Sequence, residues 1–114
     1  MISVRSVSRF IVPMLAGLAL ATTAHAADIP AGEKIATERC AACHGKDGNT
    51  PIDPSYPRLS GQHEDYLIQS LRAYKADQRK NAIMAAQAKT LSREDILNLA
   101  AYYSRLPGVM SHAR

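Results

Sequence analysis

The chain is short, weakly basic and poor in aromatic residues. It has 114 residues, of which 46% are hydrophobic and 5% aromatic, and it contains no Trp. This length supports one small domain and excludes a protein with several independent cores. The formal net charge of +4 is not gathered into a basic helix or an aromatic and basic stripe, so the composition gives no support to nucleic-acid binding.

The N-terminal segment has the three regions of a secretory signal peptide. Residues 1–9 carry two arginines and no acid, residues 10–21 are mostly apolar, and Ala24-His25-Ala26 has the small-x-small pattern of a cleavage site. We predict cleavage after Ala26, which divides the chain into a signal peptide, 1–26, and one domain, 27–114. The apolar run is too short to cross a bilayer of about 30 Å comfortably, so we expect a periplasmic protein without a permanent membrane anchor.

The first predicted helix runs from about Ala31 to Ala42 and leads into the motif Cys40-Ala41-Ala42-Cys43-His44. A C-x-x-C-H run is the attachment signature of a covalently bound c-type haem. The two thiols lie about one helical turn apart on one side of the backbone, so both can add to the vinyl groups along one porphyrin edge. His44 then follows where its imidazole can serve as the proximal ligand to iron.

Two other uses of the paired cysteines are less well supported. A thioredoxin-like redox disulfide belongs beside a βαβ pattern, and the sequence contains no alternating or β-branched run. A zinc site needs four ligands, and only the isolated His63 and His112 follow the motif. We expect His63 to help cap the second helix and His112 to lie in the C-terminal tail.

An ordered loop and a second helix follow the motif. Residues 45–61 contain three glycines and three prolines among short polar residues, which indicates a loop rather than a strand. The second helix is predicted to start between Gln62 and Glu64 and to end near Gln78. Glu64 and Asp65 fall in its first turn, where acidic side chains interact favourably with the helix dipole.

The third predicted helix has the clearest boundaries. Ser92 is followed three residues later by Asp95, which resembles a capping box, and Pro107-Gly108 ends the helix. Apolar residues then recur at helical spacing at Ile96, Leu99, Ala100 and Tyr103. The sequence therefore predicts an all-α domain with three main helices. A domain this small buries only about 60% of its unfolded surface, so we expect it to depend on the haem for a stable core.

The sixth ligand of the iron decides the function, because an open position could bind oxygen, nitric oxide or peroxide. Of the four methionines, Met1 and Met14 leave with the signal peptide, and Met110 lies beyond the third helix in a tail expected to fray. Met84, in the connection between the second and third helices, remains as the candidate axial ligand. The alternative is that Met84 is ordinary apolar filler.

Further matches accompany the haem motif. Gly32 precedes Cys40 by eight residues, Tyr102 lies in the third helix, and two segments, 56–62 and 79–84, carry the runs YPRLSGQ and RKNAIM. With these residues the mature chain resembles the class I c-type cytochromes, particularly small bacterial single-haem forms and the half-domains of periplasmic di-haem cytochromes. The resemblance implies a small cytochrome c fold, with helices and ordered loops around one covalent haem, and a crossing of the first and last helices at Gly32 and Tyr102.

The resemblance also assigns roles to single residues. The Pro57 carbonyl would accept the second ring N–H of His44 and so fix the orientation of the imidazole. Leu59 belongs to the same haem-binding segment. Arg58 and Arg79 would pair with the haem propionates, or else are solvated surface cations.

The segment 79–84 would deliver Met84 to the iron. Related sequences often have Gly where this chain has Ala76 or Asp77, so the form of the turn before Met84 is left open. Four lysines either surround an exposed haem edge and steer acidic partners or belong to the usual soluble surface: Lys46, Lys75, Lys80 and Lys89.

The expected function is one-electron transfer by a monomeric carrier that is not an enzyme. Its partners would be redox proteins, such as a dehydrogenase or quinol-oxidising complex as donor and a terminal oxidase or reductase as acceptor. One alternative is a haem c enzyme or gas-binding sensor with a labile sixth ligand. Another is a permanent haem c subunit of a larger oxidoreductase.

Overall fold

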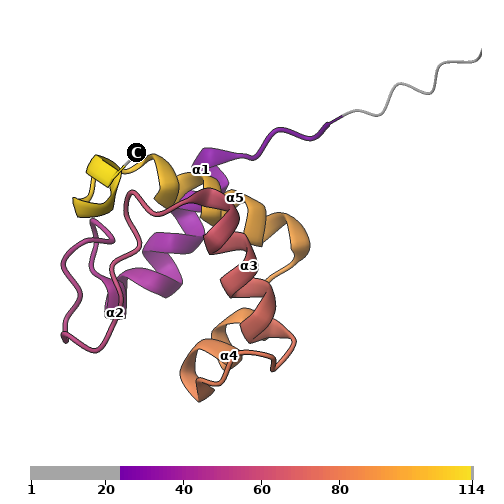
Figure 1. Cartoon of the computed structure of the whole chain (residues 1–114). Helices are drawn as coiled ribbons and strands as arrows, with labels where there is room; N and C mark the ends of the chain where they lie inside the picture. The colour runs from indigo at the N-terminus through magenta and orange to yellow at the C-terminus, as the bar shows by residue number, and fades with distance from the viewer. Residues whose placement is uncertain (1–23, 114) are drawn as a thin grey trace, which may run out of the picture.

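The computed structural model describes residues 24–113, and this part of the chain is helical without strands (Figure 1). The predicted signal peptide lies outside the described residues except for 24–26, which are exposed and non-helical. Within residues 24–113, no helix has both the length and the apolar character needed to span a bilayer. The prediction of an all-α fold is confirmed.

The N-terminal helical run is longer than predicted and changes its winding. It consists of α1 (Ile29–Ile35), a π-helical segment η1 (Ala36–Cys40) and α2 (Ala41–His44). Asp28 starts α1 by accepting a hydrogen bond from the Ala31 N–H at 3.0 Å, three residues before the predicted start. The π-helical winding ends at Cys40, the first residue of the cysteine motif. Segments of this kind often occur at functional sites.

The second helix, α3 (Glu64–Lys75), ends three residues earlier than predicted. Asp77 adopts a left-handed conformation with φ of 56°, and the N–H of Gln78 donates to the Ala73 carbonyl at 2.8 Å. These are the features of a Schellman C-cap, in which glycine is the usual left-handed residue. His63 occupies the N-cap position of α3, but its side chain forms no capping hydrogen bond, so the expected capping role is wrong.

A fourth helix, α4 (Ala82–Lys89), was not predicted. Asn81 caps it by accepting a hydrogen bond from the Met84 N–H at 2.9 Å. The segment is rich in alanine and therefore has high helix propensity without an amphipathic pattern.

The last long helix, α5 (Arg93–Arg105), begins with the predicted capping box. The Ser92 hydroxyl accepts from the Asp95 N–H at 3.0 Å, and the Asp95 carboxylate accepts from the Ser92 N–H at 2.8 Å. The tail forms a short 3-10 helix, η2 (Val109–Ala113), rather than fraying. Met110 is held there because its sulfur accepts a hydrogen bond from Gln62 Nε2 at 3.3 Å.

The helices α1 and α5 cross at Gly32, as the resemblance implied. A Cβ atom at Gly32 would lie 2.2 Å from the backbone oxygen of Asn98 and 3.1 Å from Cβ of Tyr102. Only a residue without a side chain permits this approach of two helix backbones. Around the crossing, α3 packs against α5, and α4 packs chiefly against α3 (Figure 1).

The buried core is aliphatic apart from one tyrosine and joins α3, α5 and the N-terminal helical run. Its members are Ala36, Leu67, Leu91, Ile96, Leu99, Ala100 and Tyr103. Cys40 and Leu59 are partly buried against this cluster, so the core continues directly into the region of the cysteine motif.

Candidate functional site

His44 ends α2 with a buried and oriented imidazole ring. The residue is 5% exposed, and its Nδ1–H donates a hydrogen bond to the Pro57 carbonyl at 2.9 Å. Because a carbonyl oxygen can only accept, this contact assigns the hydrogen to Nδ1 and leaves the Nε2 lone pair for a metal. The Tyr56 ring packs edge-on against the imidazole, with ring centroids 6.2 Å apart.

The loop that carries Pro57 is ordered by its own hydrogen bonds, as the sequence predicted. Asp47 accepts from the Asn49 N–H, the Thr50 hydroxyl and the Thr50 N–H, each at 2.9 Å, and these bonds lower the pKa of the Asp47 carboxyl. The carbonyl of Gly48 accepts from the Leu59 N–H at 2.7 Å. The loop therefore folds back on itself, and Pro57 lies next to the His44 imidazole at the end of α2.

The two thiols lie on the helical run that ends in His44. Cys40 and Cys43 are both free and half-buried. Burial raises the pKa of the Cys40 thiol, while a hydrogen bond with Tyr103 and the charge of Arg39 oppose that rise. Burial also raises the pKa of the Tyr103 hydroxyl far above its ordinary value, so this group stays protonated beside the sulfur.

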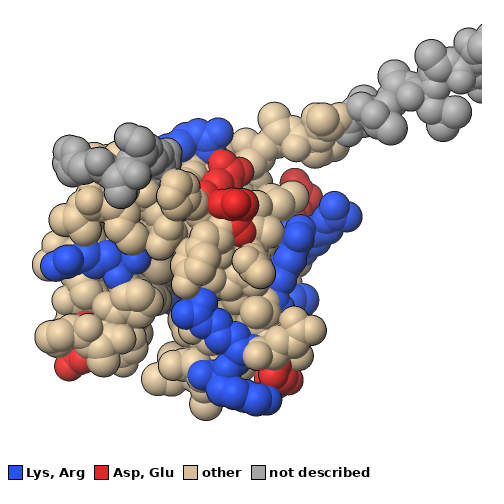
Figure 2. All heavy atoms as spheres, in the orientation of Figure 1, with Lys and Arg blue, Asp and Glu red and all other residues tan. Residues whose placement is uncertain are grey.

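Met84 lies in the first turn of α4 and is half-buried. In Figure 1, α2 and α4 occupy the same lower end of the molecule, and Figure 2 shows the surface hollowed between them. The helix carrying His44 and the helix carrying Met84 therefore lie on either side of one hollow. Met110, in η2, is instead bound to Gln62.

These residues fit a covalently bound haem. Two adjacent thiols, an imidazole with a free Nε2 and a thioether are the donor set that attaches and ligates a c-type haem. Within residues 24–113, no three His, Cys, Asp or Glu side chains gather in a group that could hold a metal ion by themselves.

Arg58 and Arg79, the two residues expected to pair with haem propionates, form contacts with residues close to them in the sequence. Arg58 Nε donates to the Asn49 carbonyl at 3.0 Å. Arg79 donates to the Ser70 hydroxyl at 3.0 Å and lies over the Tyr74 ring, 4.9 Å from its centroid. Their pairing with propionates stays a prediction.

Three of the four lysines singled out from the sequence lie around α4 and form hydrogen bonds or an ion pair there. Lys75 Nζ donates to the carbonyls of Lys89 and Leu91, and Lys80 Nζ donates to the Asp77 carbonyl at 2.9 Å. Lys89 pairs with the Asp77 carboxylate at 3.4 Å. Figure 2 shows basic side chains gathered over this part of the surface.

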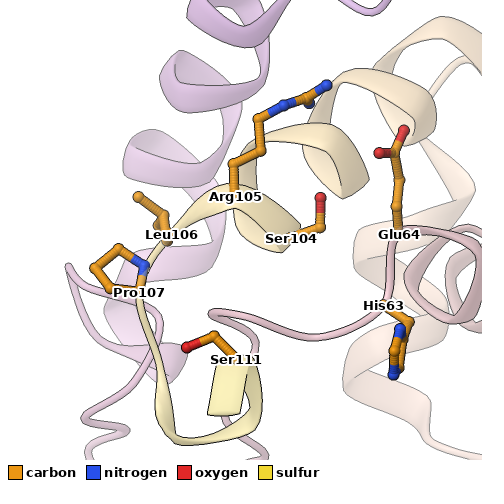
Figure 3. A pocket seen from close by; sticks show the side chains of 7 residues that line it. All are labelled: His63, Glu64, Ser104, Arg105, Leu106, Pro107 and Ser111. Carbon is orange, nitrogen blue, oxygen red and sulfur yellow. The ribbon is translucent and has the colours of Figure 1, made fainter. Parts of the chain in front are cut away.

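A separate cavity of about 650 Å³ lies where α3 begins and α5 ends (Figure 3). It is lined by His63, Glu64, Ser104, Arg105, Leu106, Pro107 and Ser111. Figure 3 shows that the side chains of Arg105 and His63 point in opposite directions instead of converging. The cavity contains none of the predicted haem residues.

The sequence reasoning missed α4 and the contacts that Cys40 and Arg39 make with distant segments. An N-cap residue, Asn81, before an alanine-rich run was a signal for α4. The Cys40 contact with Tyr103 joins residues far apart in the sequence, and local patterns give no signal for such a pair.

Comparison with known proteins places these features in a family. The family model described as cytochrome c matches residues 29–106. The chain is 51% identical over 83 residues to cytochrome c-554(548) of Halomonas halodenitrificans, an alignment covering 69% of this chain and 96% of the relative. It is 45% identical over 67 residues to a thiosulfate dehydrogenase electron acceptor of Thiomonas intermedia, covering 59% of this chain and 31% of that protein.

Among solved structures, the chain is similar to reduced recombinant cytochrome c4 from Pseudomonas stutzeri. The TM-score is 0.64 and the identity 39%, with 73% of this chain and 47% of that chain covered. The chain spans about half the length of the cytochrome c4 relatives that it matches.

Proposed function

The chain belongs to the cytochrome c family, whose cofactor is covalently bound haem c, and we propose that it is a periplasmic one-electron carrier with a single haem. Its relatives are electron-transfer proteins, including cytochromes c4 and c-554(548). The observation that carries the proposal is the orientation of His44. Its buried ring donates Nδ1–H to Pro57 and presents Nε2 as a ligand.

The attachment is assigned to Cys40 and Cys43. Both thiols are free, and they lie on the helical run that ends with His44. Two thioether bonds on one rigid segment would fix the ring relative to the imidazole. When bound, the haem supplies one-electron exchange between ferrous and ferric iron.

We assign the sixth ligand to Met84. The residue lies on α4 across the surface hollow from α2, and its backbone N–H is fixed by Asn81. A thioether is a soft ligand that raises the reduction potential relative to a second imidazole. If His44 and Met84 both ligate the iron, small molecules would have no free site at the metal, and the protein would carry electrons without acting as an enzyme.

The partners are proposed to be other periplasmic redox proteins. The name of the Thiomonas intermedia relative states that it accepts electrons from thiosulfate dehydrogenase, which makes a dehydrogenase of this kind a candidate donor. The basic side chains around α4 would attract an acidic surface on such a partner.

Two variants of the purified holoprotein test the ligand assignment. Met84→Ala should abolish the sulfur-to-iron absorption band near the red end of the ferric spectrum, whereas Met110→Ala should retain it because Met110 is bound to Gln62. Retention of the band in Met84→Ala, or its loss in Met110→Ala, would refute the assignment. Acid–acetone extraction of the same samples should leave the pigment on the polypeptide, and its release would refute thioether attachment.

A further inference from the structure

Arg39 joins two segments that are far apart in the sequence. It lies in η1 immediately before Cys40, and its Nη2 donates to the Gln87 carbonyl at 2.8 Å and to the Thr90 hydroxyl at 2.6 Å. The Gln87 side-chain oxygen lies at 3.2 Å from the same nitrogen. Since Nη2 carries two hydrogens, the two short contacts are the principal bonds and the third is shared.

These acceptors lie at the C-terminal end of α4. Gln87 belongs to its last turn and Thr90 is its C-cap. The carbonyl groups at a helix C-terminus carry partial negative charge, so a guanidinium group is well suited to this position. All of these contacts come from one nitrogen, and the planar guanidinium holds the two N–H bonds of that nitrogen in fixed directions, whereas an ammonium group rotates.

The C-terminal end of α4 is also held by α3. The main packing partner of α4 is α3, and Ala88 and Leu91 anchor its C-terminal end in the interior at 0% and 4% exposure. Lys75 of α3 donates to carbonyls of the same end. Arg39 supplies the hydrogen bonds that tie this end to the helical run carrying the cysteine motif.

We propose that Arg39 is a positioning residue that fixes α4, and with it Met84, relative to the segment that carries Cys40 and His44. The inference rests on the proposed ligation by Met84. An axial ligand must be held to within about 0.5 Å of its working position. Because α4 is a single helix of eight residues, restraint at its C-terminal end is transmitted to Met84 in its first turn.

The test compares holoprotein variants on both sides of the contact. Arg39→Gln removes the charge and the planar guanidinium group, and Thr90→Val removes one acceptor without changing a residue next to the haem attachment. Arg39→Lys keeps the charge but loses the fixed direction of the two N–H bonds. The matched control is Lys34→Gln, which removes a charge from an exposed residue of α1.

Two readouts are measured on each variant. Hydrogen exchange followed by mass spectrometry reports the opening of α4, and we expect its amides to exchange roughly fivefold faster in Arg39→Gln and Thr90→Val, with α5 unchanged. The rate of carbon monoxide binding to the ferrous protein reports displacement of the methionine, and it should rise by a similar factor. Arg39→Lys should lie between the wild type and Arg39→Gln, and Lys34→Gln should match the wild type.

The outcomes separate this inference from the proposed function. Unchanged exchange of α4 in both Arg39→Gln and Thr90→Val would overturn the inference, as would faster exchange with unchanged carbon monoxide binding. If the wild-type holoprotein lacks the sulfur-to-iron band, the ligation by Met84 fails, and the claim that Arg39 positions that ligand is overturned with it. The exchange data would then still establish whether Arg39 holds α4.

Discussion

Replacement of Gly32 by alanine tests the crossing of α1 and α5, the most extensively packed pair of helices among the described residues. The added Cβ would lie 2.2 Å from the backbone oxygen of Asn98 and 2.6 Å from its carbonyl carbon. Neither atom can move aside as a flexible side chain would, so the helices must separate. Separation would also strain the hydrogen bond from the Asp28 N–H to the Asn98 side chain, now 2.8 Å long.

The size of the effect follows from two opposing contributions. Overpacking of this kind costs about 3 kcal/mol, and the higher helix propensity of alanine returns about 1 kcal/mol. A net loss of about 2 kcal/mol corresponds to a melting temperature lower by roughly 8 to 16 °C in a domain of this size. Thermal unfolding of the holoprotein by circular dichroism measures the shift.

The control is Thr37→Ala, an exposed position in the same helical run. It should stay within about 0.5 kcal/mol of the wild type. If Gly32→Ala melts within about 2 °C of the wild type, the close approach of the two backbones is not what holds the helices together.

Three further predictions concern the ends of helices and the loop. Asp77 has a φ of 56° and its ion pair with Lys89 is exposed, so Asp77→Gly should be at least as stable as the wild type and about 1 kcal/mol more stable than Asp77→Ala. Urea unfolding compares the three proteins, and equal stability of the two variants would contradict the argument that the backbone at Asp77 is strained. The lowered pKa of Asp47 contributes stability that is present above the unfolded value of 3.8 and is lost as the pH falls from there through the lower, folded-state value. Urea unfolding at pH 7 and pH 3 should therefore show a smaller deficit of Asp47→Asn at pH 3 than at pH 7, and an equal deficit at both pH values would count against this origin. Asn81→Ala should lower the unfolding free energy by about 1 kcal/mol through loss of the bond to the Met84 N–H, with Asn81→Ser restoring most of it; equal melting of both variants would exclude capping as the cause.

The sequence predicted the structure best where a short local pattern is compatible with only one backbone arrangement. Ser92 and Asp95 form the predicted capping box, and the glycine at position 32 marks the helix crossing because no other residue fits there. The Pro57 contact to His44 is present at 2.9 Å. Its role toward an iron atom remains a prediction.

Other features depend on contacts or backbone angles that no local pattern encodes. The end of α3 is set by the left-handed conformation of Asp77, which the sequence indicated only as a place where relatives often have glycine. The α4 helix has no amphipathic repeat, so hydrophobic periodicity gives no signal for it. The hydrogen bond from Arg39 to Thr90 joins residues 51 positions apart, and only the folded chain brings these groups together.

Binding of carbon monoxide to the reduced wild-type holoprotein tests most directly whether two side chains of the protein ligate the iron. With His44 and Met84 as ligands, the ferrous protein should resist rapid binding, and Met84→Ala should bind carbon monoxide rapidly and in full. Rapid and complete binding by the wild type would contradict the electron carrier and favour a haem enzyme or gas sensor with a labile sixth ligand.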